Sequence, residues 1–250
     1  MTSSAAIELE GVSAGYNGDP VVRELSIEVA PGEVVGLLGP NGAGKTTTLR
    51  TISAEVKPSA GTVRVMGEPT GSVSVQQLAR RGLAHVAEQG NHFASLTVAE
   101  NLRLAFPKPR AARVEATELT FHLFPALEGL MSRPAGLLSG GEQQMLAMAQ
   151  AIAPRPKVML IDELSLGLAP VIVEQLLPTV RKAASETGCA VVLVEQHIPM
   201  ALEVVDRAYV LSQGRIQMKG DAVELSKRRD LLTSSYLGEE VTIEHDEVQV

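Results

Sequence analysis

The chain has one cysteine, few aromatic residues and no long apolar run, and these shortages limit the classes of protein to which it can belong. Its single cysteine, Cys189, excludes an internal disulfide, and the apolar residues beside it indicate an ordinary buried thiol. No segment approaches the roughly 18 uninterrupted apolar residues that a membrane-crossing helix needs. Residues 1–10 lack the basic start and apolar centre of a secretory signal. These shortages predict a cytoplasmic protein.

Positive charge is also scarce, because 22 lysines and arginines face 29 aspartates and glutamates, for a formal net charge of −7. This balance argues against nucleic acid or anionic lipid as the main partner, although it leaves room for a local basic patch. Acidic residues crowd into the tail at residues 238–250, which is typical of a frayed chain end. A hydrophobic content of 45% allows a substantial core in one large domain or two lobes.

A complete phosphate-binding loop at residues 39–47 is the most informative stretch that is present. In the pattern G-x-x-x-x-G-K-[ST], small residues let consecutive backbone N–H groups curl around phosphates, Lys45 adds a positive charge and Thr46 offers a hydroxyl to magnesium. Residues 33–38 form an apolar run typical of a buried strand, and residues 46–52 can begin a helix whose N-terminus faces an anion. This context favours a phosphate loop over an ordinary glycine-rich turn. The predicted nucleotide ligands in the loop are Gly39, Pro40, Asn41, Gly42, Ala43, Gly44, Lys45, Thr46 and Thr47.

A second glycine turn lies at residues 138–144, with the sequence Leu-Ser-Gly-Gly-Glu-Gln-Gln. The residues after it have the composition of a helix, so another helix N-terminus is expected to point outward. Two anion sites in one small domain suggest a shared ligand.

Two adjacent carboxylates, Asp162 and Glu163, end an apolar strand at residues 158–161. Because side chains alternate across a strand, we expect the two carboxylates to have different roles. Asp162 can hold magnesium through water beside Thr46, and Glu163 can orient or deprotonate an attacking water. A solvated strand-to-loop transition is the alternative for such a pair, and the phosphate loop upstream argues against it.

Together these motifs resemble the nucleotide-binding subunit of ATP-binding cassette (ABC) transporters, over residues 7–237. The resemblance implies an α/β fold: a P-loop NTPase core with a parallel sheet, a small antiparallel β subdomain and an inserted helical subdomain. It implies binding of ATP and Mg²⁺, and two cassettes that close head to tail around two ATP molecules. Ser139, Gly140 and Gly141, with Glu142 beside them, would then contact nucleotide bound to the partner cassette.

Tyr16 falls where the family places an aromatic ring that stacks on adenine. The chain has only three tyrosines and four phenylalanines, and Tyr16 lies in a glycine-flanked turn without an obvious core role. A partly buried turn tyrosine is the alternative interpretation.

Four further segments resemble the second ATPase subunit of branched-chain amino acid importers, and urea and short-amide importers use similar cassettes. These segments are residues 96–102, 165–170, 194–196 and 206–215. The resemblance implies multi-spanning permease partners at the cytoplasmic face of the membrane and, indirectly, a separate solute-binding protein. The second cassette would be a copy of this chain or a paralogue.

Other classes remain as alternatives. An exporter cassette shares nearly every motif. A soluble ABC ATPase would normally have two cassettes in one chain or a long coiled-coil insertion, and neither is present. An interaction module without catalysis is disfavoured by the intact Lys45, Asp162 and Glu163.

The chain departs from the wider family at three places. Glu88 stands where most cassettes have a glutamine that senses magnesium; its charge could bind the metal more strongly, but it would repel the terminal phosphate unless the metal lay between them. In the wider family a switch histidine follows the strand after the acidic pair and contacts the terminal phosphate. Counting back from Asp206 with the family's usual spacing puts Gln196 at this position and His197 one place late. Both remain catalytic candidates, with Gln196 favoured and a solvated loop histidine as the alternative for His197. Leu164 replaces a common proline and Ala169 a common aspartate, and neither change removes a phosphate ligand.

Hydrophobic patterns predict the arrangement of elements along the chain. Alternation over residues 7–29 and 61–66 predicts a small antiparallel sheet. Proline-punctuated helical stretches such as residues 110–124 predict a helical lobe. Further on, strands at residues 157–161 and 190–194 are expected to bracket a helix at residues 171–186, opened by Pro170 and bent at Pro178. We therefore expect one ABC ATPase domain over residues 1–250: a core at 1–87 and 140–237, a helical subdomain at 88–139 and an acidic tail at 238–250.

Overall fold

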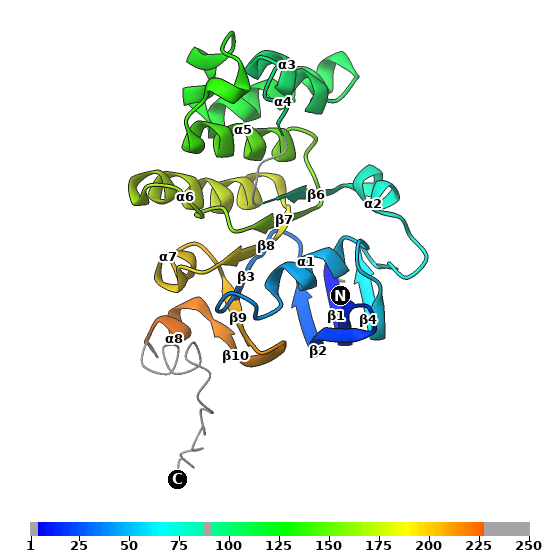
Figure 1. The fold of residues 1–250 in the computed structure, drawn as a ribbon. Coiled ribbons are helices and arrows are strands. Elements are labelled where there is room, and N and C mark those ends of the chain that lie inside the picture. The colour runs from blue at the N-terminus through cyan, green and yellow to red at the C-terminus, as the bar shows by residue number, and fades with distance from the viewer. Residues whose placement is uncertain (1–4, 88–91, 228–250) are drawn as a thin grey trace.

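A computed structural model of the chain describes residues 5–87 and 92–227. Within these residues the larger sheet has six strands in the order β10-β9-β3-β8-β7-β6 (Figure 1). Neighbours from β9 to β6 are parallel, and β10 pairs with β9 in the antiparallel sense. The strands are β3 (Val34–Leu38), β6 (Leu83–Val86), β7 (Val158–Asp162), β8 (Ala190–Glu195), β9 (Arg207–Ser212) and β10 (Arg215–Asp221).

Every residue of β3, β7 and β8 is buried, as expected for parallel strands covered on both faces. Alternate residues of these strands enter two different apolar clusters: Leu38 and Ile161 belong to one, Leu37 and Leu160 to the other. Helices α5 (Gly140–Ile152) and α6 (Pro170–Thr187) supply the first cluster, and α1 (Lys45–Ile52) supplies the second. The sheet therefore lies between two layers and presents its strand ends to the loops.

The smaller sheet is antiparallel, with the order β2-β1-β4-β5. Its central strand β1 pairs with β2 on one side and β4 on the other, so that Ile7 lies opposite both Val29 and Val65. The expected antiparallel sheet is thus confirmed. Its strands are β1 (Ile7–Tyr16), β2 (Asp19–Val29), β4 (Pro58–Val65) and β5 (Glu68–Pro69).

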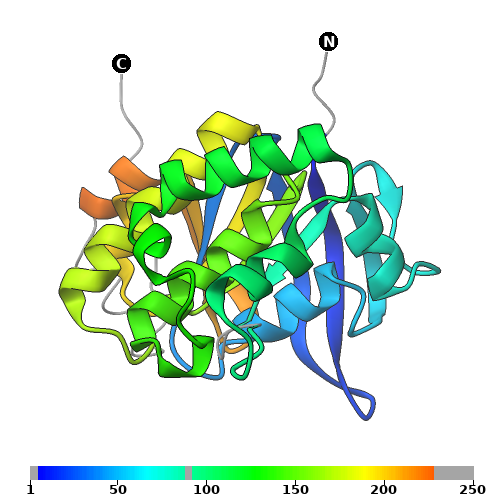
Figure 2. The ribbon, with the colours of Figure 1, turned by 90° about the horizontal axis from the view of Figure 1, so that it is seen from above.

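A group of helices lies above α6 in Figure 1 and overlies the sheets in the view from above (Figure 2). It comprises α3 (Val98–Ala105), α4 (Arg110–Leu123), two 3₁₀ turns (Pro125–Leu130 and Ala135–Leu137) and α5. Prolines mark boundaries between elements of this group, since Pro109 precedes α4 and Pro125 opens the first 3₁₀ turn. The expected helical lobe is present, whereas its predicted limits at residues 88 and 139 stay a prediction.

Helix α6 begins at Pro170 as expected and carries Pro178 inside it. The remaining helices are short: α2 (Val75–Arg81), α7 (Ile198–Leu202) and α8 (Ala222–Lys227). Among the residues that the structure describes, no helix combines the length and apolar character needed to cross a membrane.

Candidate nucleotide site

The phosphate loop leaves the carboxyl end of β3 and enters α1 at Lys45, and its glycines are required by geometry. Gly39 and Gly44 have φ values of 147° and 103°, and a Cβ there would lie 2.2 Å from the Leu211 carbonyl oxygen and 2.4 Å from Val22 Cγ1. Gly42, with φ 79°, faces open space. Among the described residues no side chain caps α1, and its first turn holds no acid. Its first N–H groups therefore remain available to an anion.

Lys45 is nearly completely buried, with 4% of its surface exposed. Its ammonium donates to the carbonyl oxygens of Gly39 at 2.9 Å and Pro40 at 3.1 Å, and lies 3.5 Å from Glu163 Oε1. A buried ammonium needs such partners. The charge of Lys45 is therefore held between the loop and the acidic strand end, where a phosphate bound by the loop would meet it.

Asp162 ends β7 and accepts a hydrogen bond from the Thr46 hydroxyl at 3.3 Å. Burial raises the pKa of the Asp162 carboxyl and the charge of Glu163 adds to this rise, while the bond from Thr46 opposes it. No group of three His, Cys, Asp or Glu that could hold a metal occurs in residues 5–87 and 92–227. The hydroxyl and carboxylate oxygens of Thr46 and Asp162 fit Mg²⁺, which uses few protein ligands and keeps water and phosphate oxygens.

Glu163 follows β7 with a left-handed backbone, φ 49°, which is uncommon outside glycine and costs on the order of 1–3 kcal/mol. Its N–H donates to the Val194 carbonyl oxygen at 3.0 Å, so the turn is fixed to β8. Gln196 Nε2 donates to Glu163 Oε2 at 2.6 Å. The carboxylate is thus held by an amide on one oxygen and an ammonium near the other.

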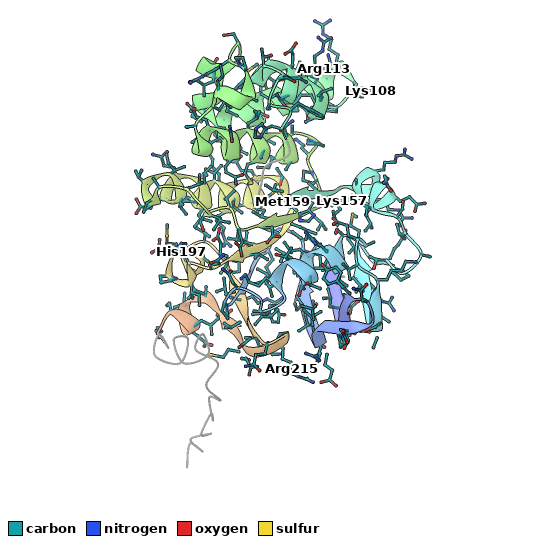
Figure 3. The ribbon with its side chains drawn as sticks, in the orientation of Figure 1. Lys108, Arg113, Lys157, Met159, His197 and Arg215 are labelled. Atoms are coloured by element: carbon teal, nitrogen blue, oxygen red, sulfur yellow. The ribbon has the colours of Figure 1, made fainter. Side chains whose placement is uncertain are left out.

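A pocket of about 390 Å³ brings much of this group together. Predicted residues lining it are Asn41, Gly42, Gly44, Lys45, Thr46, Thr47, Glu163 and Gln196. His197 does not line the pocket; it is exposed and immediately precedes α7 (Figure 3). Of the two candidates, the structure places Gln196 beside Glu163.

The second glycine turn lies elsewhere in the chain. Ser139 caps α5: its N–H and its hydroxyl both donate to Glu142 Oε2, at 2.7 and 2.9 Å, and the Glu142 N–H donates back to the Ser139 hydroxyl. These bonds hold the pKa of the Glu142 carboxyl below its usual value. The turn does not line the pocket, and Figure 1 shows α5 well separated from α1. Within one chain the two glycine turns are therefore apart, with β7 and α6 between α5 and α1, and the shared ligand stays a prediction for a pair of cassettes.

Tyr16 does not line the pocket, and neither do Gly39, Pro40, Ala43 and Asp162. Tyr16 lies at the end of β1 with 43% of its surface exposed, and its hydroxyl accepts a hydrogen bond from Arg50 at 3.3 Å. Glu88 lies outside the described residues.

The sequence interpretation missed Val21 and Leu166, which line the pocket, and a buried pair formed by Ser165 and Glu195. A signal existed for Glu195 only, since it is a charged residue continuing the apolar run at 190–194. Val21 and Leu166 reach the pocket through tertiary packing that no local pattern reveals.

Comparison with known proteins places this site in a family. A family model described as "ABC transporter" matches residues 22–165. The chain is 38% identical over 237 residues to the high-affinity branched-chain amino acid transport ATP-binding protein BraG of Pseudomonas aeruginosa, covering 93% of this chain and 99% of that protein. It is 33% identical over 215 residues to a probable branched-chain amino acid transport ATP-binding protein, LivF, of Archaeoglobus fulgidus, covering 86% and 91%.

A lipopolysaccharide export system ATP-binding protein, LptB, of Acidithiobacillus ferridurans is 29% identical over 242 residues, covering 96% of this chain and all of that protein. A solved structure described as the ATP binding subunit of an ABC transporter has a TM-score of 0.80 at 26% identity, covering 93% and 99%. With a phosphate loop at the end of a parallel strand and relatives matched over nearly their whole length, the chain belongs to the ABC transporter family and is an ATP-hydrolysing cassette with the α/β P-loop NTPase fold.

Proposed function

We propose that this cassette powers a membrane importer and that branched-chain amino acids are the transported solute. The observation that carries the proposal is the match to BraG, at 38% identity over nearly the full length of both chains. The match to LptB is equally long but lower, at 29%. An exporter cassette is therefore the weaker candidate, and a urea or short-amide importer is the nearest alternative within the importer class.

In this proposal the phosphate loop and Lys45 bind the phosphates of ATP, and Tyr16 stacks on adenine. Thr46 and Asp162 would hold Mg²⁺, which would neutralise charge on the phosphate oxygens. Support comes from the buried ammonium of Lys45 and the 3.3 Å contact between Thr46 and Asp162. Glu88 would join the magnesium ligands.

Glu163 is the proposed base that takes a proton from the attacking water. Its carboxylate lies 3.5 Å from Lys45 Nζ and 2.6 Å from Gln196 Nε2, so both oxygens are oriented before any water arrives. Preorganisation of this kind is how a general base reaches the proton it removes. Gln196 is the proposed positioning residue of the switch, and His197 would need a change in its loop to take part.

The proposed assembly is a head-to-tail pair of cassettes docked on a multi-spanning permease at the cytoplasmic face of the membrane. Ser139, Gly140, Gly141 and Glu142 would reach the nucleotide bound to the partner cassette. The separation of α5 from α1 within one chain supports this arrangement, since the exposed turn at Ser139 does not line the nucleotide pocket formed by the described residues. A solute-binding protein would deliver the solute to the permease.

The test is the composition of the complex recovered from the native cells with the Glu163→Gln variant in the presence of ATP. We expect two permeases and a second cassette, together with ATP that is bound but not hydrolysed, because general bases contribute about 10²–10⁴-fold to rate. Uptake of labelled leucine, isoleucine and valine should then depend on this chain. Uptake of urea alone would move the cargo to the amide class, and exporter components would refute the importer. Unimpaired hydrolysis by Glu163→Gln would refute the assigned base.

A further inference from the structure

Ser165 and Glu195 form a buried hydrogen-bonded pair beside the proposed catalytic group. The Ser165 N–H donates to Glu195 Oε1 at 3.0 Å, and the Ser165 hydroxyl donates to Glu195 Oε2 at 2.5 Å. Glu195 is 1% exposed and Ser165 is 6% exposed. Ser165 lies two residues after Glu163, and Glu195 directly precedes Gln196, so the pair joins the two segments that carry the proposed base and its amide partner.

Burying a carboxyl group this deeply costs free energy, so packing alone does not explain why Glu195 is there. Burial raises the pKa of the Glu195 carboxyl, and the hydrogen bonds from Ser165 and from the Gln196 N–H oppose that rise without cancelling it. Apolar residues fill the rest of β8, whose every position is buried. Buried polar groups persist where all their partners are satisfied and where they specify one arrangement of the chain. At Glu195 that arrangement is the path of the turn from Asp162 to Ser165.

The turn needs such a restraint because Glu163 is held in a backbone region that residues with a Cβ rarely adopt, φ 49°. Strained backbone conformations of this kind persist only when several surrounding contacts hold them in place. Two attachments to β8 do so here: the Glu163 N–H donates to the Val194 carbonyl oxygen, and Ser165 donates twice to Glu195. Leu164, between them, is buried at 1% exposure. Glu163 is thus fixed on both sides to the strand that carries Gln196.

We propose that Glu195 is a positioning residue for ATP hydrolysis, which acts through Ser165 to keep the Glu163 carboxylate against Gln196. This inference rests on the proposed role of Glu163 as the base. Neither Ser165 nor Glu195 lines the pocket itself, so we expect nucleotide binding to survive when the pair is loosened. Loosening the pair lowers only the fraction of time that Glu163 spends in the productive orientation.

The test is a kinetic comparison of the full chain with Ser165→Ala, Glu195→Gln and the double variant. Ser165→Ala removes one donor from the pair, and Glu195→Gln replaces one of its two acceptor oxygens with a donor. We expect each single change to lower kcat on the order of tenfold, below the hundredfold that a full ångström of misplacement can cost, with KM for ATP within about twofold. The double variant should be no slower than the slower single variant, because both changes break the same contact. Ser165→Thr, which keeps the hydroxyl, should restore kcat toward the wild-type value.

Val180→Ala is the matched control, since Val180 is fully buried in α6 and its truncation destabilises the core without touching the turn. Assayed well below the melting temperature of every variant, Val180→Ala should keep the wild-type kcat. The proposal is overturned if Ser165→Ala and Glu195→Gln leave kcat unchanged, or if their effects on kcat add in the double variant. It is also overturned if Val180→Ala, with the same loss of melting temperature as these variants, lowers kcat as much as they do. Glu163→Gln distinguishes a failure of the proposed positioning role from a failure of the proposed base. If Glu163→Gln is inactive while the Ser165 and Glu195 variants keep the wild-type kcat, only the positioning role of Glu195 is refuted.

Discussion

The two helix starts of this chain that follow glycine-rich turns have opposite surroundings. The start of α1 is buried: Lys45 is 4% exposed and Gly39 and Gly44 are packed against β9 and β2. The start of α5 is exposed at Ser139 and Gly140, and its own residues cap it through the reciprocal bonds of Ser139 and Glu142. One start leaves its N–H groups to a ligand, whereas the other satisfies part of its own.

The difference shows how each region obtains its geometry. The α1 region depends on the register of β3, β8 and β7, since the carboxylates that face Lys45 come from the end of β7, far along the chain. The α5 turn depends on four consecutive residues and needs little else from the chain. We therefore expect damage at α1 to weaken nucleotide binding in each chain, and the effect of damage at α5 to appear only when two chains act together.

The largest effect is expected from Lys45→Ala. Loss of the buried charge should weaken ATP binding about 100-fold, equivalent to roughly 2.7 kcal/mol, because the loop then binds phosphate with backbone N–H groups alone. Isothermal titration calorimetry with ATP measures this directly. Lys108→Ala is the control, since that lysine is exposed and far from the loop (Figure 3). Tight ATP binding by Lys45→Ala would contradict the assigned site.

The next test mixes two inactive chains, Lys45→Ala and Ser139→Arg. If the α5 start serves a partner's nucleotide in a pair of identical cassettes, mixed pairs contain one intact site and hydrolysis should return to about a quarter of the wild-type rate. Each variant alone should be inactive, and the Ser139→Arg chain should still bind ATP. Hydrolysis by Ser139→Arg on its own would show that the α5 start does not contribute to the site at α1. If both single variants are inactive and the mixture is inactive too, the pairing is with a paralogue.

Two glycines of the phosphate loop separate backbone strain from packing. Gly44→Ala should lower the free energy of unfolding by about 2–3 kcal/mol, because it combines a left-handed φ with a Cβ placed 2.4 Å from Val22 Cγ1. Gly42→Ala has a positive φ and open space, so about 1 kcal/mol is expected. Chemical denaturation compares the two variants. Equal losses would show that the site at Gly44 relaxes and that packing adds nothing there.

The smallest effect concerns the cap of α5 and its dependence on pH. Since hydrogen bonds to Ser139 lower the folded-state pKa of Glu142, the cap stabilises the fold above the unfolded pKa of about 4.3 and loses this contribution as pH falls through the lower folded value. Ser139→Ala should cost about 1 kcal/mol at pH 7. NMR titration of Glu142 should give a lower pKa in the wild type than in Ser139→Ala. Identical values would show that the cap does not form in solution.

The parts of the fold that were predicted from sequence are those that contiguous residues specify. The alternation in residues 7–29 and the apolar runs before Lys45 and Asp162 predicted β1, β2, β3 and β7 correctly, because side-chain periodicity follows from local backbone geometry. The helical lobe was predicted from helix-forming stretches broken by prolines. The ligand shared by the two glycine turns stays a prediction, because nothing local reports which face of the sheet a distant helix covers.

The sequence by itself determined that the chain binds the phosphates of a nucleotide, since a phosphate loop needs only neighbouring N–H groups, one lysine and one hydroxyl. Tertiary structure alone decided which distant groups meet there. The pairing of Asp162 with Val194 in β7 and β8 brings Gln196 rather than His197 to Glu163, and places Glu195 under Ser165. The reason is that a one-residue shift of either strand would exchange the faces of all these side chains, and only the packing of the whole sheet fixes that register.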